Sequence, residues 1–231
     1  APAVGAEQLR RAHALLSKYK AGKAALEQRI LENERWYKLR HWDCMRRGTS
    51  EVEPASAWLF NCIANKHASA MDSMPAPCVL PREESDRDEA KMLSAIIPVI
   101  LAQNDFEQVY SDAWDHKCRF GTAVYGVFWD SSKLSGLGDI AVRDVDILSL
   151  YWEPGVRDIQ DSQNVFSVQL TDTDLLLDTY PFLEGKLSGA ARDFASYVSD
   201  EAVDLSEKTA VIDWYYKKRQ GGRTVLHYCK F

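Results

Sequence analysis

The fold is decided by the stretch GTAVYGVFWDSSKLSGLGDIAVRDV, residues 121–145, where the periodicity of the sequence changes from helical to β. Thr122–Asp130 is rich in β-branched and aromatic residues, and Asp139–Val145 alternates apolar with polar residues. Ser131–Gly138, between them, is a loop that contains two glycines. Two such runs joined by a glycine-containing loop are typical of a β-hairpin.

Upstream of residue 121 the sequence is helical. It is rich in Ala, Leu, Glu, Lys and Arg, with apolar positions three and four residues apart. Prolines between residues 75 and 81 predict an extended connector. The predicted helices are Glu7–Trp42, with a break at Gly22; Glu51–Ser73, after a turn at Gly48–Ser50, with Pro54 in its first turn and Trp58, Cys62 and Ile63 on its buried side; Ser85–Gln103, with a capping box at Ser85 and Asp88 and a kink or break at Pro98; and a last helix capped by Asp105 and ending near Phe120.

Downstream of residue 145 the sequence predicts more short strands. They are Leu148–Trp152, Val165–Leu170, and a second hairpin of Thr209–Lys218 and Thr224–Phe231, with a short helix capped by Thr171 and Asp174 and an exposed acidic excursion over 184–208. Helices come first, and no β-α-β alternation is repeated. The sequence therefore predicts an α+β fold with a mostly antiparallel sheet.

The net charge of −6 is unevenly distributed along the chain. Residues 1–47 carry +6, residues 48–208 carry −16, and residues 209–231 carry +4. We therefore predict a basic N-terminal helical arm over 1–47 and an α+β domain over 48–231. The acidic middle disfavours tight binding to a phosphate backbone, although many ordinary proteins are equally acidic. The basic helix is either a solvated face or a contact for a partner or nucleic acid.

We expect neither a membrane span nor a signal peptide, because no window of ~18 apolar residues exists and the N-terminus lacks a charged n-region followed by an apolar h-region. The five cysteines are widely spaced and form no CxxC pair, which favours reduced thiols in a core. The chain begins with Ala1, and Tyr228–Phe231 stops within a strand-like pattern. We therefore expect a fragment of a longer protein, truncated at its C-terminus.

Two sets of residues have the chemistry of metal ligands. His41, Cys44, Cys62 and His67 have tolerable spacing for zinc, but structural zinc sites normally use closely spaced Cys pairs. Asp139, Asp144 and Asp146 lie on or beside one predicted strand, with Asp130 across the hairpin, and a two-metal nuclease could use such carboxylates. No Glu-x-Lys completes a nuclease pattern, and Asp is common at hairpin ends. We expect no metal and no cofactor.

Other catalytic patterns are missing from the sequence. It has no phosphate-binding loop, no HExxH and no GxSxG. Asp115 and His116 are adjacent on a predicted helix and so point in different directions. Trp214–Arg219 interleaves aromatic and basic residues, as a platform for single-stranded bases does, but a charged edge strand explains it as well. The residues alone predict a non-catalytic α+β module.

Nine short motifs, in order from about Glu27 to Phe231, resemble portal proteins of tailed bacteriophages, in particular those of prophages of Gram-positive bacteria. Each motif alone is weak, and the resemblance depends on their order and spacing. The motifs are Asn33-Glu-Arg-Trp-Tyr37 with Trp42, Ala57-Trp-Leu-Phe-Asn61, Met74-Pro75 with Leu80-Pro-Arg-Glu83, Asn104-Asp-Phe106, Phe120-Gly-Thr122, Gly138-Asp-Ile140 with Asp146, Trp152-Glu-Pro-Gly155, Asp158-Ile-Gln160, and Asp213-Trp-Tyr-Tyr-Lys217.

The resemblance implies a structural protein that forms a ring, usually of twelve subunits, at one capsid vertex. Double-stranded DNA passes through such a ring during packaging and ejection. It implies as partners further copies of the chain, the terminase, head-completion and capsid proteins, and DNA in transit, with no membrane. It also implies location in the virion, with assembly in the host cytoplasm. This part of the chain would form the outer wing, whereas stem, clip and crown come largely from later sequence.

The subunit interface is the functional site that the sequence predicts. A basic helix facing an acidic neighbour favours head-to-tail contacts. The candidate residues are Arg35, Arg40, Arg46, Arg47, Trp36 and Trp42. Two other functions stay open at this point: a metal-dependent phage DNA-processing enzyme that uses the aspartates, and a monomeric virion adaptor.

Overall fold

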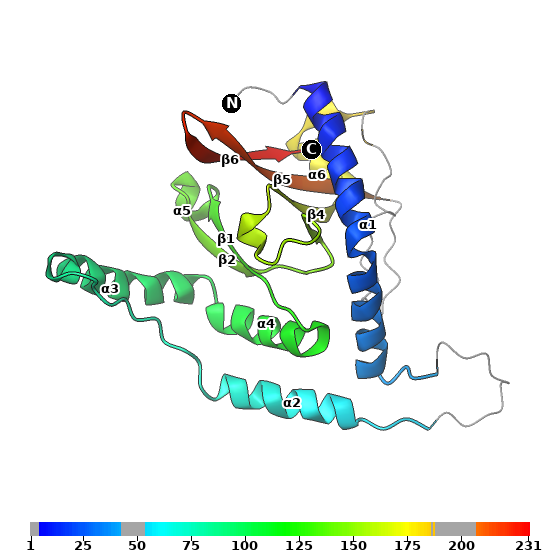
Figure 1. Cartoon of the computed structure of the whole chain (residues 1–231), viewed down its shortest axis with the longest axis vertical. Helices are drawn as coiled ribbons and strands as arrows, with labels where there is room; N and C mark the ends of the chain where they lie inside the picture. The colour runs from blue at the N-terminus through cyan, green and yellow to red at the C-terminus, as the bar shows by residue number, and fades with distance from the viewer. Residues whose placement is uncertain (1–4, 43–53, 186, 188–206) are drawn as a thin grey trace. The chain divides into compact units, whose positions relative to one another are not determined.

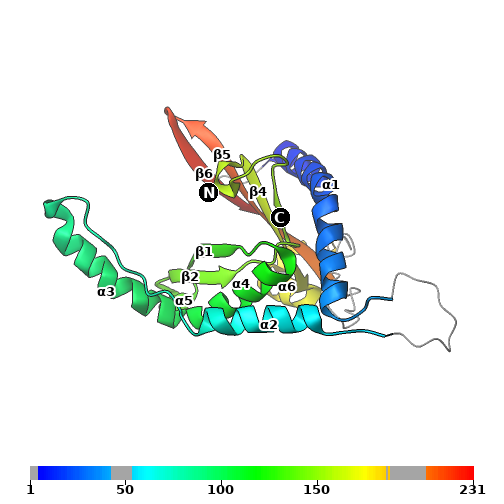
Figure 2. The same ribbon diagram turned by 60° about the horizontal axis from the view of Figure 1, so that its bottom comes forward.

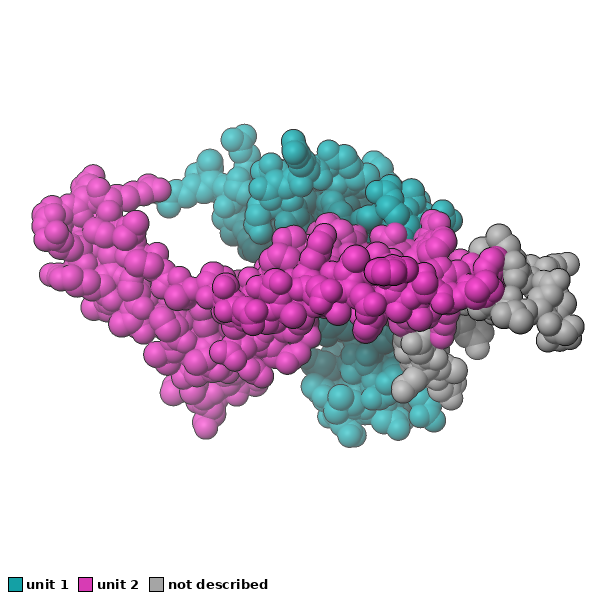
Figure 3. Space-filling view, turned by 90° about the horizontal axis from the view of Figure 1, so that it is seen from below, with its two compact units in different colours: residues 1–31, 147–231 teal, residues 32–146 magenta. Residues whose placement is uncertain are grey.

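The computed structural model describes residues 5–42, 54–185, 187 and 207–231. The chain divides into two compact units, residues 1–31 with 147–231 (unit 1) and residues 32–146 (unit 2) (Figure 3). Each unit combines helices with an antiparallel sheet, so the predicted α+β class is confirmed (Figure 1). The boundary predicted between residues 47 and 48 lies outside the described residues and stays a prediction, as does the turn at residues 48–50.

Unit 1 is built on a four-stranded antiparallel sheet of order β3-β4-β5-β6 (Figure 1). Its strands are β3 (Leu150–Trp152), β4 (Asn164–Asp172), β5 (Lys208–Gln220) and β6 (Arg223–Lys230), and its helical elements are the first 26 residues of α1 (Ala6–Tyr37), η2 (Ile159–Asp161), α6 (Thr173–Thr179) and η3 (Pro181–Leu183). Apolar side chains of α1 pack on one face of this sheet. The core cluster is Ala12, Leu16, Tyr19, Tyr151, Phe166, Val168, Ile212, Trp214 and Tyr216.

Helix α1 runs through Gly22 without the break that the sequence predicts. A Cβ atom at this position would lie 2.6 Å from Cγ of Pro154, so the glycine lets the Pro154 ring approach the helix backbone. The prediction was wrong because a glycine can serve close packing as well as a turn. At the next residue, the Lys23 ammonium donates a hydrogen bond to the Leu148 carbonyl at 3.0 Å, which joins the helix to the segment before β3.

Unit 2 contains three longer helices and the first hairpin (Figures 1 and 2). Its elements are the end of α1, α2 (Trp58–Met71), η1 (Glu84–Asp86), α3 (Arg87–Gln103), α4 (Phe106–Phe120), β1 (Tyr125–Asp130), the short α5 (Lys133–Gly136) and β2 (Asp139–Asp144). The hairpin is confirmed: Tyr125 pairs with Asp144 and Asp130 with Asp139. The described strands therefore form two sheets, one in each unit.

Helix α2 begins later than predicted. Its first helical hydrogen bond runs from Asn61 N to the Ala57 carbonyl, and the Pro54 carbonyl instead accepts a bond from the Trp42 indole at 3.0 Å. The predicted buried side was wrong for Trp58, which is 75% exposed, and for Cys62, which is also exposed. It was right for Ile63.

The boundaries of α3 and α4 are close to those predicted, but the predicted side-chain caps do not form. The Ser85 hydroxyl bonds Asp86 instead of closing a capping box, and α3 continues through Pro98. Asp105 precedes α4 in a left-handed conformation and makes no side-chain cap. Helix α6 likewise starts at Thr173, after Asp172, without a side-chain cap.

Strand β5 is internal, which corrects the prediction of an edge strand at Trp214–Arg219. It lies between β4 and β6, and Trp214 is buried in the core against Phe166. The residue is therefore part of the packing of unit 1 and offers no face on which a base could stack. Most of the excursion predicted over 184–208 lies outside the described residues.

Candidate subunit-interface site

The C-terminal end of α1 carries the predicted interface residues and closes in a Schellman motif. Leu39 takes a left-handed conformation (φ 59°), its N–H bonds the Trp36 carbonyl, and the N–H of Arg40 bonds the Arg35 carbonyl. This bonding pattern satisfies the last carbonyls of a helix. Glycine usually occupies the left-handed position, so a leucine there strains the backbone. The motif holds Arg35 and Arg40 at one helix end, where both are exposed.

A buried ion pair anchors this helix end within unit 2. Nη1 of Arg119 on α4 lies 3.0 Å from both carboxylate oxygens of Glu34, and its Nη2 lies 2.7 Å from Asp115. The Glu34 side chain is only 6% exposed and that of Arg119 14%. Lys38 also contacts Glu34 at 3.0 Å, and the Asn33 amide donates to the Arg119 carbonyl. The last turns of α1 are thereby fixed to the end of α4.

The two candidate tryptophans differ in exposure and in bonding. Trp36 is 48% exposed, and its ring packs edge-on against His41, with centroids 4.6 Å apart. Trp42 is half-buried, and its indole N–H is occupied by the Pro54 carbonyl. Trp36 therefore joins Arg35 and Arg40 on the surface, while Trp42 has a structural bond. Arg46 and Arg47 lie outside the described residues.

The aspartates of the alternative metal site are engaged separately. Asp144 lies 2.7 Å from Nδ1 of His116, while Asp130 accepts bonds from Ser132 and pairs with Arg143. Burial raises the pKa of Asp144, against the opposing effect of His116. Within the described ranges, no three His, Cys, Asp or Glu residues are grouped so that they could hold a metal ion.

The two dyad residues, and His67 of the residues considered for zinc, also have other partners. Of the four residues considered for zinc, His67 bonds Ser111 on α4, and Cys44 lies outside the described residues. Asp115 and His116 point in different directions, as predicted: Asp115 pairs with Arg119 and His116 with Asp144.

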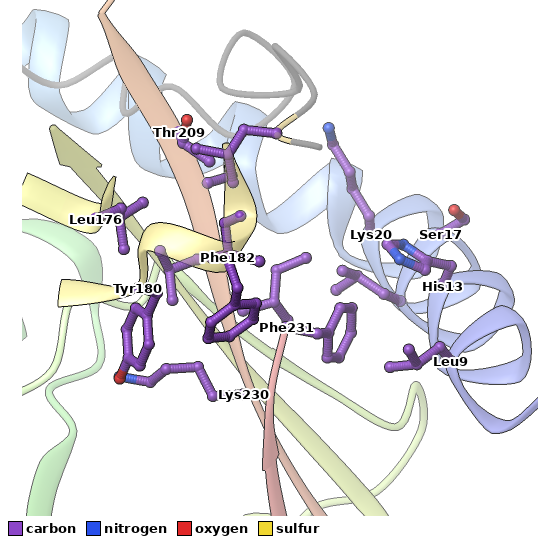
Figure 4. Close-up of a pocket in the computed structure, with 16 residues that line it drawn as sticks. Leu9, His13, Ser17, Lys20, Leu176, Tyr180, Phe182, Thr209, Lys230 and Phe231 are labelled. Atoms are coloured by element: carbon purple, nitrogen blue, oxygen red, sulfur yellow. The ribbon is translucent and has the colours of Figure 1, made fainter. Parts of the chain in front are cut away.

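Unit 1 has an apolar hollow of about 650 Å³ between α1, η3 and the ends of β5 and β6 (Figure 4). The rings of Tyr180, Phe182 and Phe231 line it, and Lys20 and Lys230 lie at its margin. His13, the imidazole in its wall, packs edge-on against Phe231 at 4.9 Å. This lining suits an apolar chain segment better than it suits acid–base chemistry.

In a comparison with family models, residues 28–229 match the family described as phage P22-like portal protein. The match covers most of both units. The chain belongs to the P22-like phage portal protein family. No curated protein matches the chain. As a portal protein it belongs to a structural family of the phage capsid vertex. Among the described helices, none combines the length and apolar character that crossing a bilayer requires.

Residues that carry the resemblance to portal proteins hold the fold together. The Asn104 amide donates to the carbonyls of Ile100 and Ile140, and its oxygen accepts from Val142 N and from the Lys133 ammonium. This side chain thereby joins the end of α3 to β2. The motif at Trp152–Gly155 supplies the proline that packs on Gly22.

The portal chain also exposes apolar surface that the motifs did not indicate. In unit 2 many of the exposed apolar side chains lie on α2, α3 and β1, and they include Trp58 and Trp129. The sequence signal that could have found the group on α3 is the run Met92–Ala102, in which Ser94 is the one polar residue. A helix that is apolar on every side is normally buried.

Proposed function

We propose that this chain is part of a subunit of the portal ring, at the capsid vertex through which double-stranded DNA is packaged and ejected. The observation that carries the proposal is the family match over residues 28–229. In this role the chain is a structural component that uses no catalytic group and no cofactor. It is assembled in the host cytoplasm and resides in the virion.

The charge and the surface of the chain support this role. A conduit must pass DNA without gripping it, and a segment with a charge of −16 over residues 48–208 releases few counterions from DNA. Monomeric proteins rarely expose large contiguous apolar patches, so the exposed apolar residues of unit 2 favour assembly. We propose a ring of twelve copies, with the terminase, head-completion proteins and capsid proteins as further partners.

The end of α1 is proposed as one of the contacts between subunits. Arg35, Trp36 and Arg40 are exposed there and offer two guanidinium groups beside an aromatic ring. Arginine and tryptophan are enriched in the energetically important parts of interfaces. Arg46, Arg47 and Trp42 complete the proposed set.

Electron microscopy of the full-length protein tests the proposed function. We expect rings with a central hole, and a monodisperse monomer at high concentration would overturn the proposal. Reversing Arg35, Arg40, Arg46 and Arg47 to Glu should weaken ring assembly, whereas reversing the exposed Arg10 and Lys18 should not. If the first variant assembles like the unmodified protein, the end of α1 is not an interface.

A further inference from the structure

Helix α3 presents an apolar face that unit 2 does not cover. We define this face by Met92, Leu93, Ile96 and Val99, whose exposed fractions are 63%, 48%, 44% and 54%. Met92, Ile96 and Val99 follow one another at spacings of four and three residues, so they lie along one side of the helix. Ala90 is the one buried residue of α3 among those described. An exposed apolar face of this kind on a structural protein indicates a surface that binds a partner.

The N-terminal end of the same helix is acidic. Residues 82–91 carry five acidic and three basic side chains, a net charge of −2. Glu84 pairs with Arg87, and Asp88 with Lys91, which accounts for two of the three basic residues. Glu83 and Glu89 are exposed and form no ion pair among the described residues. The apolar face of α3 therefore adjoins a negative end.

The β5–β6 hairpin of unit 1 has the complementary character. We define its basic tip by Lys217, Lys218, Arg219 and Arg223, and the span 217–223 contains no acidic residue. Arg219 and Arg223 are exposed, and neither forms an ion pair with another described residue.

Apolar side chains adjoin this basic tip on one face of the hairpin. Lys217 pairs with Leu226, Arg219 with Thr224 and Tyr215 with Tyr228, so these pairs share one face. Of the basic tip, Lys217 and Arg219 lie on this face, and Lys218 and Arg223 lie on the other face at the turn end of the hairpin. Leu226 is 63% exposed and Tyr228 54%. The hairpin thus matches α3 in both respects: apolar residues beside charge, with the opposite sign. Strand β6 is also at the edge of its sheet.

We propose that the basic tip of the β5–β6 hairpin of one subunit docks on the apolar face and acidic end of α3 of the next subunit. This inference rests on the proposed function, because it assigns contacts within the portal ring. Two different surfaces of one chain make a head-to-tail contact, which closes into a ring when the rotation fits. Burial of the apolar side chains provides the affinity, and the opposite charges select the register.

Charge swapping in the full-length protein tests the contact. The tip variant carries Arg219→Glu and Arg223→Glu, and the helix variant carries Glu83→Lys and Glu89→Lys. Each variant alone places like charges across the contact, so we expect at least ~10-fold higher protein concentration for half-assembly, measured by sedimentation velocity. The exposed pair Arg10→Glu and Lys18→Glu gives the same change in net charge as the tip variant and should assemble normally.

An equimolar mixture of the two variants decides between contacts within and between subunits. In an alternating ring, each reversed tip meets a reversed helix and each normal tip meets a normal helix, so assembly should recover. A chain with all four substitutions should also assemble. Recovery in that chain but not in the mixture would overturn the proposal in favour of an intramolecular contact. Normal assembly of each single variant would overturn it as well, while absence of rings from the unmodified protein would overturn the proposed function itself.

Discussion

Replacing Arg119 should destabilise unit 2 far more than replacing Arg119 and Glu34 together. Nη1 of Arg119 lies 3.0 Å from both oxygens of Glu34, and both side chains are largely buried. The substitution Arg119→Met keeps the volume that packs near Tyr37 but leaves a buried carboxylate with Lys38 as its remaining cation. The last turns of α1 would then lose their charged anchor on α4.

The magnitude follows from the burial of the pair. Removing one partner of a buried ion pair costs about 3–5 kcal/mol, because the other charge stays desolvated. Since Lys38 still neutralises part of the Glu34 charge, we expect the lower end, about 3 kcal/mol. For a chain of this size that loss lowers the melting temperature by about 6–12 °C. The double variant Arg119→Met with Glu34→Met replaces both charges by apolar groups and should lie within about 1 kcal/mol of the unmodified chain.

Urea denaturation of the four proteins in a double-mutant cycle measures the coupling between the two residues. We expect a coupling free energy of at least about 2 kcal/mol, with Arg119→Met less stable than the double variant. Circular dichroism of each variant checks that the helices are retained. The reasoning is refuted if Arg119→Met costs less than about 1 kcal/mol, or if the effects of the two substitutions simply add.

Three further predictions concern single positions. Gly22→Ala should lose about 1 kcal/mol in urea denaturation, because the clash with Pro154 outweighs the gain in helix propensity. Gly5→Ala is the control, because a Cβ atom there would meet nothing within 4 Å beyond its chain neighbours, and a gain at Gly22 would contradict the close approach. Leu39→Gly should gain about 1 kcal/mol by relieving the left-handed strain, whereas Leu39→Ala should not, and equal effects would exclude strain as the cause. Burial raises the pKa of Asp144 above its unfolded value, so the folded state binds more protons than the unfolded state. The unmodified chain should therefore gain stability relative to Asp144→Asn as the pH falls from 7 through that raised pKa to 4. The exposed Asp88→Asn is the control, and an opposite trend in the free energy of unfolding would contradict the predicted sign.

The order of elements could be predicted from the sequence because their signals are local. The alternation in Asp139–Val145 and the glycines at residues 221 and 222 indicate hairpins within a few residues, and both hairpins form. Gly22 shows where such reasoning fails. Its role depends on Pro154, a residue distant in sequence that only the folded chain brings near. The predicted caps did not form either, since α3, α4 and α6 begin without a side-chain hydrogen bond at the N-cap.

The candidate interface could be predicted only in part. Charge counting along the chain indicates the basic end of α1, and the structure leaves Arg35 and Arg40 exposed there. Residue type could not show that the Trp42 indole bonds Pro54, or that Trp214 lies in the core of unit 1. The exposed face of α3 was missed because apolar residues at helical spacing ordinarily indicate burial, and only a structure shows which apolar helix its own unit leaves uncovered.

The residues that identify the portal family perform packing and bonding roles in the described parts of the chain. Asn104 joins α3 to β2, Pro154 packs on Gly22, and Asp213 accepts a bond from the Tyr228 hydroxyl at 2.6 Å. In an enzyme, such family-identifying residues would gather around reacting atoms. In a ring subunit the requirement is a fixed shape that presents matched surfaces to identical neighbours, and residues that fix the shape are spread through both units. The scattered motifs, each weak alone, are therefore what a structural family should leave in a sequence.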